Sequence, residues 1–174
     1  DWEYVLGVNF MNQHLAFGTL AGARKHDYPQ SFTYHEPWWK QYRVLGDYFA
    51  RLSLALSSGE QVNRVLVLEP TTTAWLYSSP AGANPRMMEN GRAFQAFLNR
   101  LEAAQVEYDL GCERILRDQA KIVAGRFAVG KRTYDLVVLP PGTENLDRRT
   151  FALLTEYTRY GGKVLYFGEA PKYV

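Results

Sequence analysis

Cys112 is the single cysteine of the chain, and a thiolate can act as a nucleophile when a base lies within hydrogen-bond reach of the sulfur. The histidines are His14, His26 and His35, so no histidine follows residue 35. The sequence therefore places no imidazole base near Cys112 along the chain. We interpret Cys112 as a packed or idle thiol rather than a catalytic one.

Two carboxylates, Glu69 and Glu169, each follow an apolar run that is typical of a buried strand. If both runs belong to one parallel sheet, the two side chains lie along the same edge of it. A retaining glycosidase needs its two carboxyl groups roughly 5 Å apart, and an inverting enzyme needs a wider gap. The sequence gives no distance between them, so we interpret both as solvated strand ends, with acid–base chemistry as the alternative.

The run Thr71-Thr72-Thr73 follows the apolar strand that ends at Pro70, and a threonine-rich loop there could hold a flavin or nucleotide phosphate. Such a site needs a helix N-terminus immediately behind the loop. Trp75, Pro80 and Pro85 indicate instead an irregular loop of about fifteen residues before the next helix. We therefore expect a loop packed by its own side chains or against a neighbouring domain, and no bound cofactor.

Metal binding and sugar binding are two further hypotheses for the aromatic, histidine-containing first part of the chain. The three histidines, with Asp27 and Glu36, have spacings that match no common metal-ligand pattern, so we expect no metal site. Aromatic rings can stack on the C–H faces of carbohydrates, although rings at helical spacing more often form a core or a domain interface. The residues considered for carbohydrate or interface contact are Phe32, Tyr34, Trp38, Trp39, Tyr42, Glu69 and Trp75.

Three apolar runs must position these groups, and the first of them, Val65 to Leu68, is the most continuous. Similar runs recur at residues 135–139 and 163–167, and each begins polar and ends at proline or glycine. Uninterrupted Val- and Leu-rich runs are typical of strands that are buried on both faces of a parallel sheet. With helical patterns between them, they predict an α/β three-layer sandwich with a mostly parallel sheet.

The remaining elements follow from periodicity and turn residues. We predict sheet strands at 63–68, 106–110, 135–139 and 163–167, and a marginal β-hairpin at 121–130. Helices are predicted from Pro37 to Gly59, from Arg86 to Ala104, as a turn at 113–119, and after a cap at Asn145 or Asp147. Residues 4–10 could form one short strand, and the rest of the first 36 residues shows no steady period.

Composition excludes several classes of protein. A formal charge of +2 on 174 residues, without a basic helix face, argues against a nucleic-acid partner. No apolar run approaches the roughly 20 residues that cross a membrane. One cysteine excludes an internal disulfide and does not identify the compartment. The chain starts Asp1-Trp2-Glu3, and we expect it to be a piece of a longer protein.

The order of elements, together with four local motifs, resembles a module of large glycoside hydrolases. The motifs are Tyr108-Asp109, the run from Gly125 to Gly130, the run from Tyr134 to Pro140, and Gly161-Gly162-Lys163-Val164. They are similar to the domain that follows the catalytic barrel in enzymes of the α-L-rhamnosidase and β-galactosidase type. That module is related to class I glutamine amidotransferases and to flavodoxin-like domains. Glu36-Pro37-Trp38-Trp39 resembles the linker that leaves the barrel.

The resemblance implies a domain organisation and a function. Residues 1–36 would be the remnant of a preceding barrel and its linker, and 37–174 the amidotransferase-like domain. The catalytic carboxylates of such enzymes lie upstream in the barrel, so the isolated chain would be a non-catalytic accessory domain. Its expected partners are the catalytic barrel of the same polypeptide, a second copy of the chain, and carbohydrate.

Two alternatives remain open, a free-standing amidotransferase-like enzyme and a flavodoxin-like module that binds a small ligand. Amidotransferases of this fold place their cysteine in a Gly-x-Cys-x-Gly turn. Here the context is Gly111-Cys112-Glu113-Arg114, which lacks the second glycine.

Overall fold

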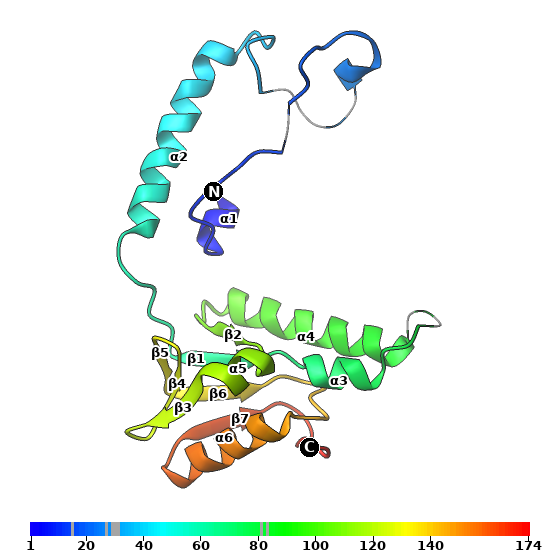
Figure 1. Ribbon diagram of the computed structural model, residues 1–174, viewed down its shortest axis with the longest axis vertical. Coiled ribbons are helices and arrows are strands. Elements are labelled where there is room, and N and C mark those ends of the chain that lie inside the picture. The colour runs from blue at the N-terminus through cyan, green and yellow to red at the C-terminus, as the bar shows by residue number, and fades with distance from the viewer. Residues whose placement is uncertain (15, 27, 29–31, 81, 83) are drawn as a thin grey trace. The chain divides into compact units, whose positions relative to one another are not determined.

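The computed structural model describes residues 1–174 apart from 15, 27, 29–31, 81 and 83 (Figure 1). The chain divides into two compact units, residues 1–61 and residues 62–174. Within the described residues, none of the helices combines the length and the apolar character that crossing a membrane requires.

The first unit is built on one long helix and a short one. Helix α1 spans Trp2–Val5, and α2 spans Tyr42–Ser57. Tyr4 is buried; its ring stacks on Phe49 with centroids 5.3 Å apart, and its hydroxyl lies 2.9 Å from the Ser53 hydroxyl. The strand predicted at residues 4–10 is therefore wrong, because the segment starts as a helical turn that packs against α2 and residues 6–10 do not form a strand.

Helix α2 begins at Tyr42, later than the start at Pro37 that the sequence predicted. A 3₁₀ turn, η2, spans Trp39–Gln41 and precedes it, while another, η1, spans Gly22–His26. Tyr42 contacts the rings of Phe32, Trp38 and Trp39, so aromatic packing occupies the residues before the helix. The helix ends at Ser57, and Gly59 has a φ of +100°, a left-handed conformation that suits glycine.

The second unit contains a four-stranded parallel sheet with the order β2-β1-β6-β7. Its strands are β1 (Val65–Leu68), β2 (Asp109–Gly111), β6 (Leu136–Leu139) and β7 (Lys163–Tyr166). All three neighbouring pairs are parallel, with Leu66 opposite Asp109 and Val137. This confirms the predicted α/β class, the mostly parallel sheet, and the internal position of the strand at 65–68. The burial on both faces predicted for 163–167 is wrong, because β7 is an edge strand whose Leu165 and Tyr166 stay about half exposed.

Two apolar clusters cover the two faces of this sheet. On one face, Val67 and Val138 pack with Phe97 and Leu98 of α4, which spans Pro85–Ala103. On the other, the core joins Leu66, Leu68, Val137 and Leu139 to α5 (Glu113–Gln119) and α6 (Arg148–Arg159). Alternate strand residues point to opposite faces, so a run of four apolar residues serves both clusters. Figure 1 shows α4 and α6 on opposite sides of the sheet.

The predicted hairpin is part of a separate three-stranded antiparallel sheet. Strands β3 (Ala120–Val123), β4 (Arg126–Val129) and β5 (Arg132–Tyr134) pair in that order. The first turn is Ala124-Gly125, and both residues have positive φ, 49° and 75°. A two-residue turn of this kind matches the twist of the strands it joins. Phe127 of β4 and Tyr134 of β5 point into the core and attach this sheet to α6.

The segment after β1 differs most from the prediction. The sequence indicated a loop of about fifteen residues, but Thr71–Leu76 forms a short helix, α3, directly behind the strand. Three consecutive β-branched residues are weak helix formers. The helix forms nevertheless because the Thr72 and Thr73 hydroxyls bond to groups outside it, including the backbone carbonyl of Asn145. Tertiary hydrogen bonds override the local preference here.

Residues 1–33 are predicted to be dispensable for folding of the rest. The unit at 62–174 has its own sheet and two apolar clusters, all drawn from residues after 62. Two truncated chains, beginning at residue 34 and at residue 62, should each keep a single cooperative unfolding transition in urea. A gradual loss of signal without a transition in both chains would show that the first part of the chain is integral to the fold.

Candidate functional site

A pocket of about 220 Å³ lies at the carboxyl end of the parallel strands, between α3 and α5. This is the edge of an open α/β sheet at which ligands usually bind. Three connections that leave the carboxyl ends of the strands form its walls. Helix α3 follows β1 directly, α5 follows β2 directly, and the loop after β6 provides the third wall. The pocket is lined by Thr71, Thr72, Trp75, Cys112, Glu113, Arg114, Arg117 and Asp147.

The Glu113 carboxylate fixes the geometry of the pocket. Its side chain belongs to the first turn of α5, and the residue is 4% exposed. One oxygen accepts a hydrogen bond from the Thr72 hydroxyl at 2.5 Å, and the other accepts one from the Asp147 backbone N–H at 2.7 Å. A single carboxylate therefore ties together α3, α5 and the start of α6. A negative charge in the first turn is also favoured by the helix dipole.

Thr73 fixes the loop after β6 through hydrogen bonds to the backbone of that loop. Its side chain is fully buried, and its hydroxyl oxygen accepts hydrogen bonds from the backbone N–H groups of Glu144 and Asn145, both at 3.0 Å. The threonine hydroxyls of residues 72 and 73 are thus engaged in structural bonds. The sequence argued against a phosphate site at this run because the next helix was expected to begin far from it. The structure corrects this expectation, since the run itself forms the start of α3. The hydroxyls of Thr72 and Thr73 are instead hydrogen-bonded within the protein.

The rim of the pocket is polar on one side and aromatic on the other. Trp75 is 67% exposed, and Arg114 and Arg117 are exposed on α5. Arg117 lies 3.5 Å from Asp118 of the same helix. Of the two predicted caps, Asn145 and Asp147, it is Asp147 that forms the N-cap of α6, and its Oδ1 accepts a hydrogen bond from the Arg149 N–H at 2.8 Å. The pocket combines an aromatic face with donors and acceptors.

A charged cluster lies beside this edge of the sheet, around Glu144. The Tyr77 hydroxyl donates to one Glu144 oxygen at 2.6 Å, and the Arg86 guanidinium donates to the other at 2.9 Å. The Tyr77 hydrogen bond, with the Arg86 guanidinium, lowers the pKa of the Glu144 carboxyl below its ordinary value. A carboxyl whose pKa is lower in the folded state stabilises the fold at neutral pH, and this contribution is lost on acidification. The cluster thus clamps the loop to α3 and α4.

A second hollow, of about 570 Å³, lies at the opposite end of the sheet and is lined by β6, β7 and the end of α6. Two charged residues, Asp135 and Lys163, line it, and Asp135 is already paired, at 3.0 Å from Arg64 and 2.8 Å from Arg126. The Asp135 carboxylate therefore serves the structure, and the pocket beside α5 is the stronger candidate site.

The structure places Cys112 at the N-cap of α5, half-buried in the pocket wall. No histidine is among the residues that line this pocket, and all three histidines belong to residues 1–61. The carboxylate next to it in sequence, Glu113, is committed to Thr72 and Asp147. The residues that line the pocket thus offer the thiol no imidazole base.

The two strand-end carboxylates lie outside this pocket. Glu69 follows β1 and is half-buried, and its backbone N–H continues the sheet by donating to the Gly111 carbonyl at 3.0 Å. Glu169 is exposed and pairs with Lys172 at 2.5 Å; this hydrogen bond lowers the pKa of the Glu169 carboxyl. Neither of them lines the pocket.

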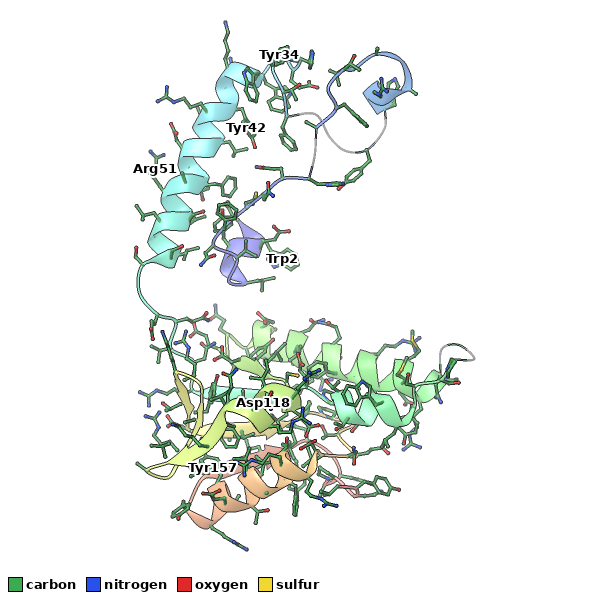
Figure 2. The ribbon with its side chains drawn as sticks, in the orientation of Figure 1. Trp2, Tyr34, Tyr42, Arg51, Asp118 and Tyr157 are labelled. Carbon is green, nitrogen blue, oxygen red and sulfur yellow. The ribbon has the colours of Figure 1, made fainter. Side chains whose placement is uncertain are left out.

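The aromatic candidates separate into two groups. Trp38 and Trp39 both contact the ring of Tyr42, and Trp39 stays 42% exposed. The ring of Tyr34 contacts the ring of His35 in a tilted arrangement, with centroids 4.2 Å apart, and Tyr34 is 74% exposed. Figure 2 shows Tyr34 and Tyr42 at the beginning of α2. Trp75 alone of these candidates lies on the pocket of the second unit.

Metal binding finds no support in the described part of the chain, where no three His, Cys, Asp or Glu side chains come together to hold an ion. One of the residues considered, Asp27, lies outside the described residues.

Sequence reasoning considered part of the pocket lining, namely the threonine run, Trp75 and Cys112, but missed Glu113, Arg114 and Arg117 as site residues. Asp147 was identified as a helix cap and not as a pocket residue. The available signal was the position of Glu113 and Arg114 immediately after a strand, at the edge where ligands bind.

Comparison with known proteins gives a structural likeness only. No family model matches the sequence, and no curated protein matches it either. Among solved structures, a rhamnosidase from Novosphingobium sp. PP1Y has a similar fold, with a TM-score of 0.55 and 20% sequence identity. The match covers 84% of this chain and 12% of that one. The chain thus has the fold of a small part of a much longer polypeptide.

Proposed function

We propose that the chain is a non-catalytic accessory domain of a glycoside hydrolase, and that its main partner is a catalytic barrel in the same polypeptide. The observation that carries the proposal is the likeness to a segment making up 12% of a rhamnosidase chain. In an enzyme of that length, the catalytic residues can lie in the part of the chain outside the matched segment. The division that we propose assigns residues 1–36 to a preceding barrel and linker, and 37–174 to the accessory domain.

The fold type is proposed to be that of class I glutamine amidotransferases and flavodoxin-like domains. Numbered along the chain, the parallel strands have the spatial order 2-1-3-4. The flavodoxin-like order is 2-1-3-4-5, which agrees over these four strands. A shared fold does not imply a shared reaction, so function must be argued from the side chains.

The carboxylates of the pocket support a non-catalytic role. Glycoside hydrolysis needs one carboxyl group to protonate the leaving oxygen and a second to act as nucleophile or base. Both Glu113 oxygens are already bonded within the protein. Asp147 commits one oxygen to capping α6, so among the carboxylates that line the pocket it has no free partner with which to form the required pair. A general acid must be able to give its proton to the substrate, and a carboxylate buried in structural bonds is unsuited to this step.

We expect the isolated chain to show no glycosidase or amidase turnover. Aryl rhamnosides, aryl galactosides and glutamine are the substrates to assay, with the wild type beside Cys112→Ala and Glu69→Gln. An active glycosidase and an active glutaminase, run in parallel, establish the detection limit. Turnover above the uncatalysed rate would contradict the proposal, and its loss in either variant would identify the residue responsible.

A further inference from the structure

The pocket between α3 and α5 has the dimensions of a site for one small ring. Pockets for drug-sized ligands and cofactors have volumes of about 300–1,000 Å³. The volume here is about 220 Å³, which is too small for a flavin or a nucleotide. Its walls come from three different connections of the sheet, and the Glu113 bonds to Thr72 and Asp147 fix them in place. The site is therefore preformed.

The charges of the lining favour a neutral, hydroxyl-rich ligand. Two arginines and two carboxylates line the pocket, so their formal charges cancel. A sugar hydroxyl both donates and accepts hydrogen bonds and can use residues of both signs. The Arg114 guanidinium supplies donors, while Asp147 uses Oδ1 to cap α6 and has a second carboxylate oxygen for a ligand hydroxyl. An anion would gain from the arginines but would be repelled by Glu113 and Asp147.

Trp75 adds the element that distinguishes a sugar from other polar ligands. Its side chain is 67% exposed, although it lines the pocket and belongs to a helix whose Thr73 is fully buried. A large aromatic ring that remains exposed at a pocket mouth offers an apolar face to a ligand. The C–H face of a pyranose is apolar while its rim is hydroxylated, which matches an aromatic platform beside a polar wall.

We propose that this pocket is a carbohydrate subsite that binds one neutral pyranose unit, with its ring stacked on Trp75 and its hydroxyls bonded to Arg114 and Asp147. The choice of a sugar among small polyols rests on the proposed function, while the location rests on the pocket alone. The subsite would hold a carbohydrate chain without reacting with it.

The test is binding to the full 174-residue chain, measured by saturation-transfer NMR and by tryptophan fluorescence. L-rhamnose, D-galactose and D-glucose are the neutral probes, and D-galacturonate and inorganic phosphate are the anionic ones. A single ring should bind with a dissociation constant of the order of 1 mM, about −4 kcal/mol. Trp75 is the only tryptophan after residue 39, so the fluorescence change should disappear in Trp75→Phe while the aromatic ring and most of the affinity remain.

The decisive variant is Trp75→Ala, which should weaken sugar binding about tenfold or more, the equivalent of about 1.4 kcal/mol. Its matched control is Trp39→Ala, an exposed tryptophan of the first unit, which should bind sugar like the wild type. Circular dichroism should show the same fold for both variants, because neither side chain is buried.

Each other outcome overturns the inference. Binding of galacturonate or phosphate alone would make the pocket an anion site. Equal affinity in Trp75→Ala would place the sugar elsewhere. No binding of any neutral sugar at tens of millimolar would remove the subsite. None of these results would contradict the accessory-domain proposal. That proposal is contradicted instead by glycosidase or amidase turnover of the isolated chain.

Discussion

Replacing Phe127 by alanine is expected to lower the free energy of unfolding by about 3–5 kcal/mol. Phe127 has no exposed surface, and its ring meets the ring of Tyr157 edge-on, with centroids 5.5 Å apart. Figure 2 shows Tyr157 on α6. The pair joins the small antiparallel sheet to the helix that covers the parallel sheet. Removing the ring would leave a cavity in a cluster that includes residues of both sheets.

The matched control is Phe151→Ala, the same change in α6 at a side chain that is 50% exposed. Because a half-exposed ring loses less contact area, this variant should lose at most about 1 kcal/mol. Urea denaturation of both variants beside the wild type measures the difference. A typical domain has only about 5–15 kcal/mol of stability, so the Phe127 variant should be visibly less stable at room temperature. Similar losses in the two variants would contradict the assignment of Phe127 to the core.

The parallel sheet could be predicted because its signal is local. A strand buried on both faces must be apolar at every position, and Val65 to Leu68 and Leu136 to Leu139 satisfy this without help from distant residues. The cap at Asp147 is local in the same way, because its side chain bonds two residues ahead. The boundaries of elements differ from the prediction by a few residues, as at the start of α2 and at both ends of β2. Such boundaries are the least sharply defined part of an element.

The geometry of the pocket could not be predicted, although its place at the strand ends could have been, because the bonds that build it are long-range. Glu113 reaches residues 72 and 147, and Thr73 reaches residues 144 and 145. The local sequence of α3 does not predict a helix, because the stability of this helix depends on hydrogen bonds to distant residues. Gly162 is a similar case. In the sequence it stands out only as part of the Gly161-Gly162-Lys163-Val164 motif, but a Cβ at this position would collide with the buried ring of Tyr157.

The second large effect is expected at Thr73, where replacement by valine should lower the free energy of unfolding by about 2–4 kcal/mol. Valine has the same shape but cannot accept the hydrogen bonds that the Glu144 and Asn145 N–H groups now donate. Leaving a buried donor without a partner costs about 1–3 kcal/mol, so two donors account for a loss of this size. The side chain is fully buried, and water cannot easily replace the missing hydroxyl.

Thr73→Ser separates the hydrogen bonds from the packing. Serine keeps the oxygen and removes one methyl group, which should cost only about 1 kcal/mol. Urea denaturation gives the two losses, and hydrogen exchange of the Glu144 and Asn145 amides identifies their origin, because both amides should exchange faster in Thr73→Val and remain protected in Thr73→Ser. Since the same loop carries Asp147, the valine variant should also weaken sugar binding at the pocket. Equal losses in the valine and serine variants would mean that the methyl group, and not the hydroxyl, holds this loop.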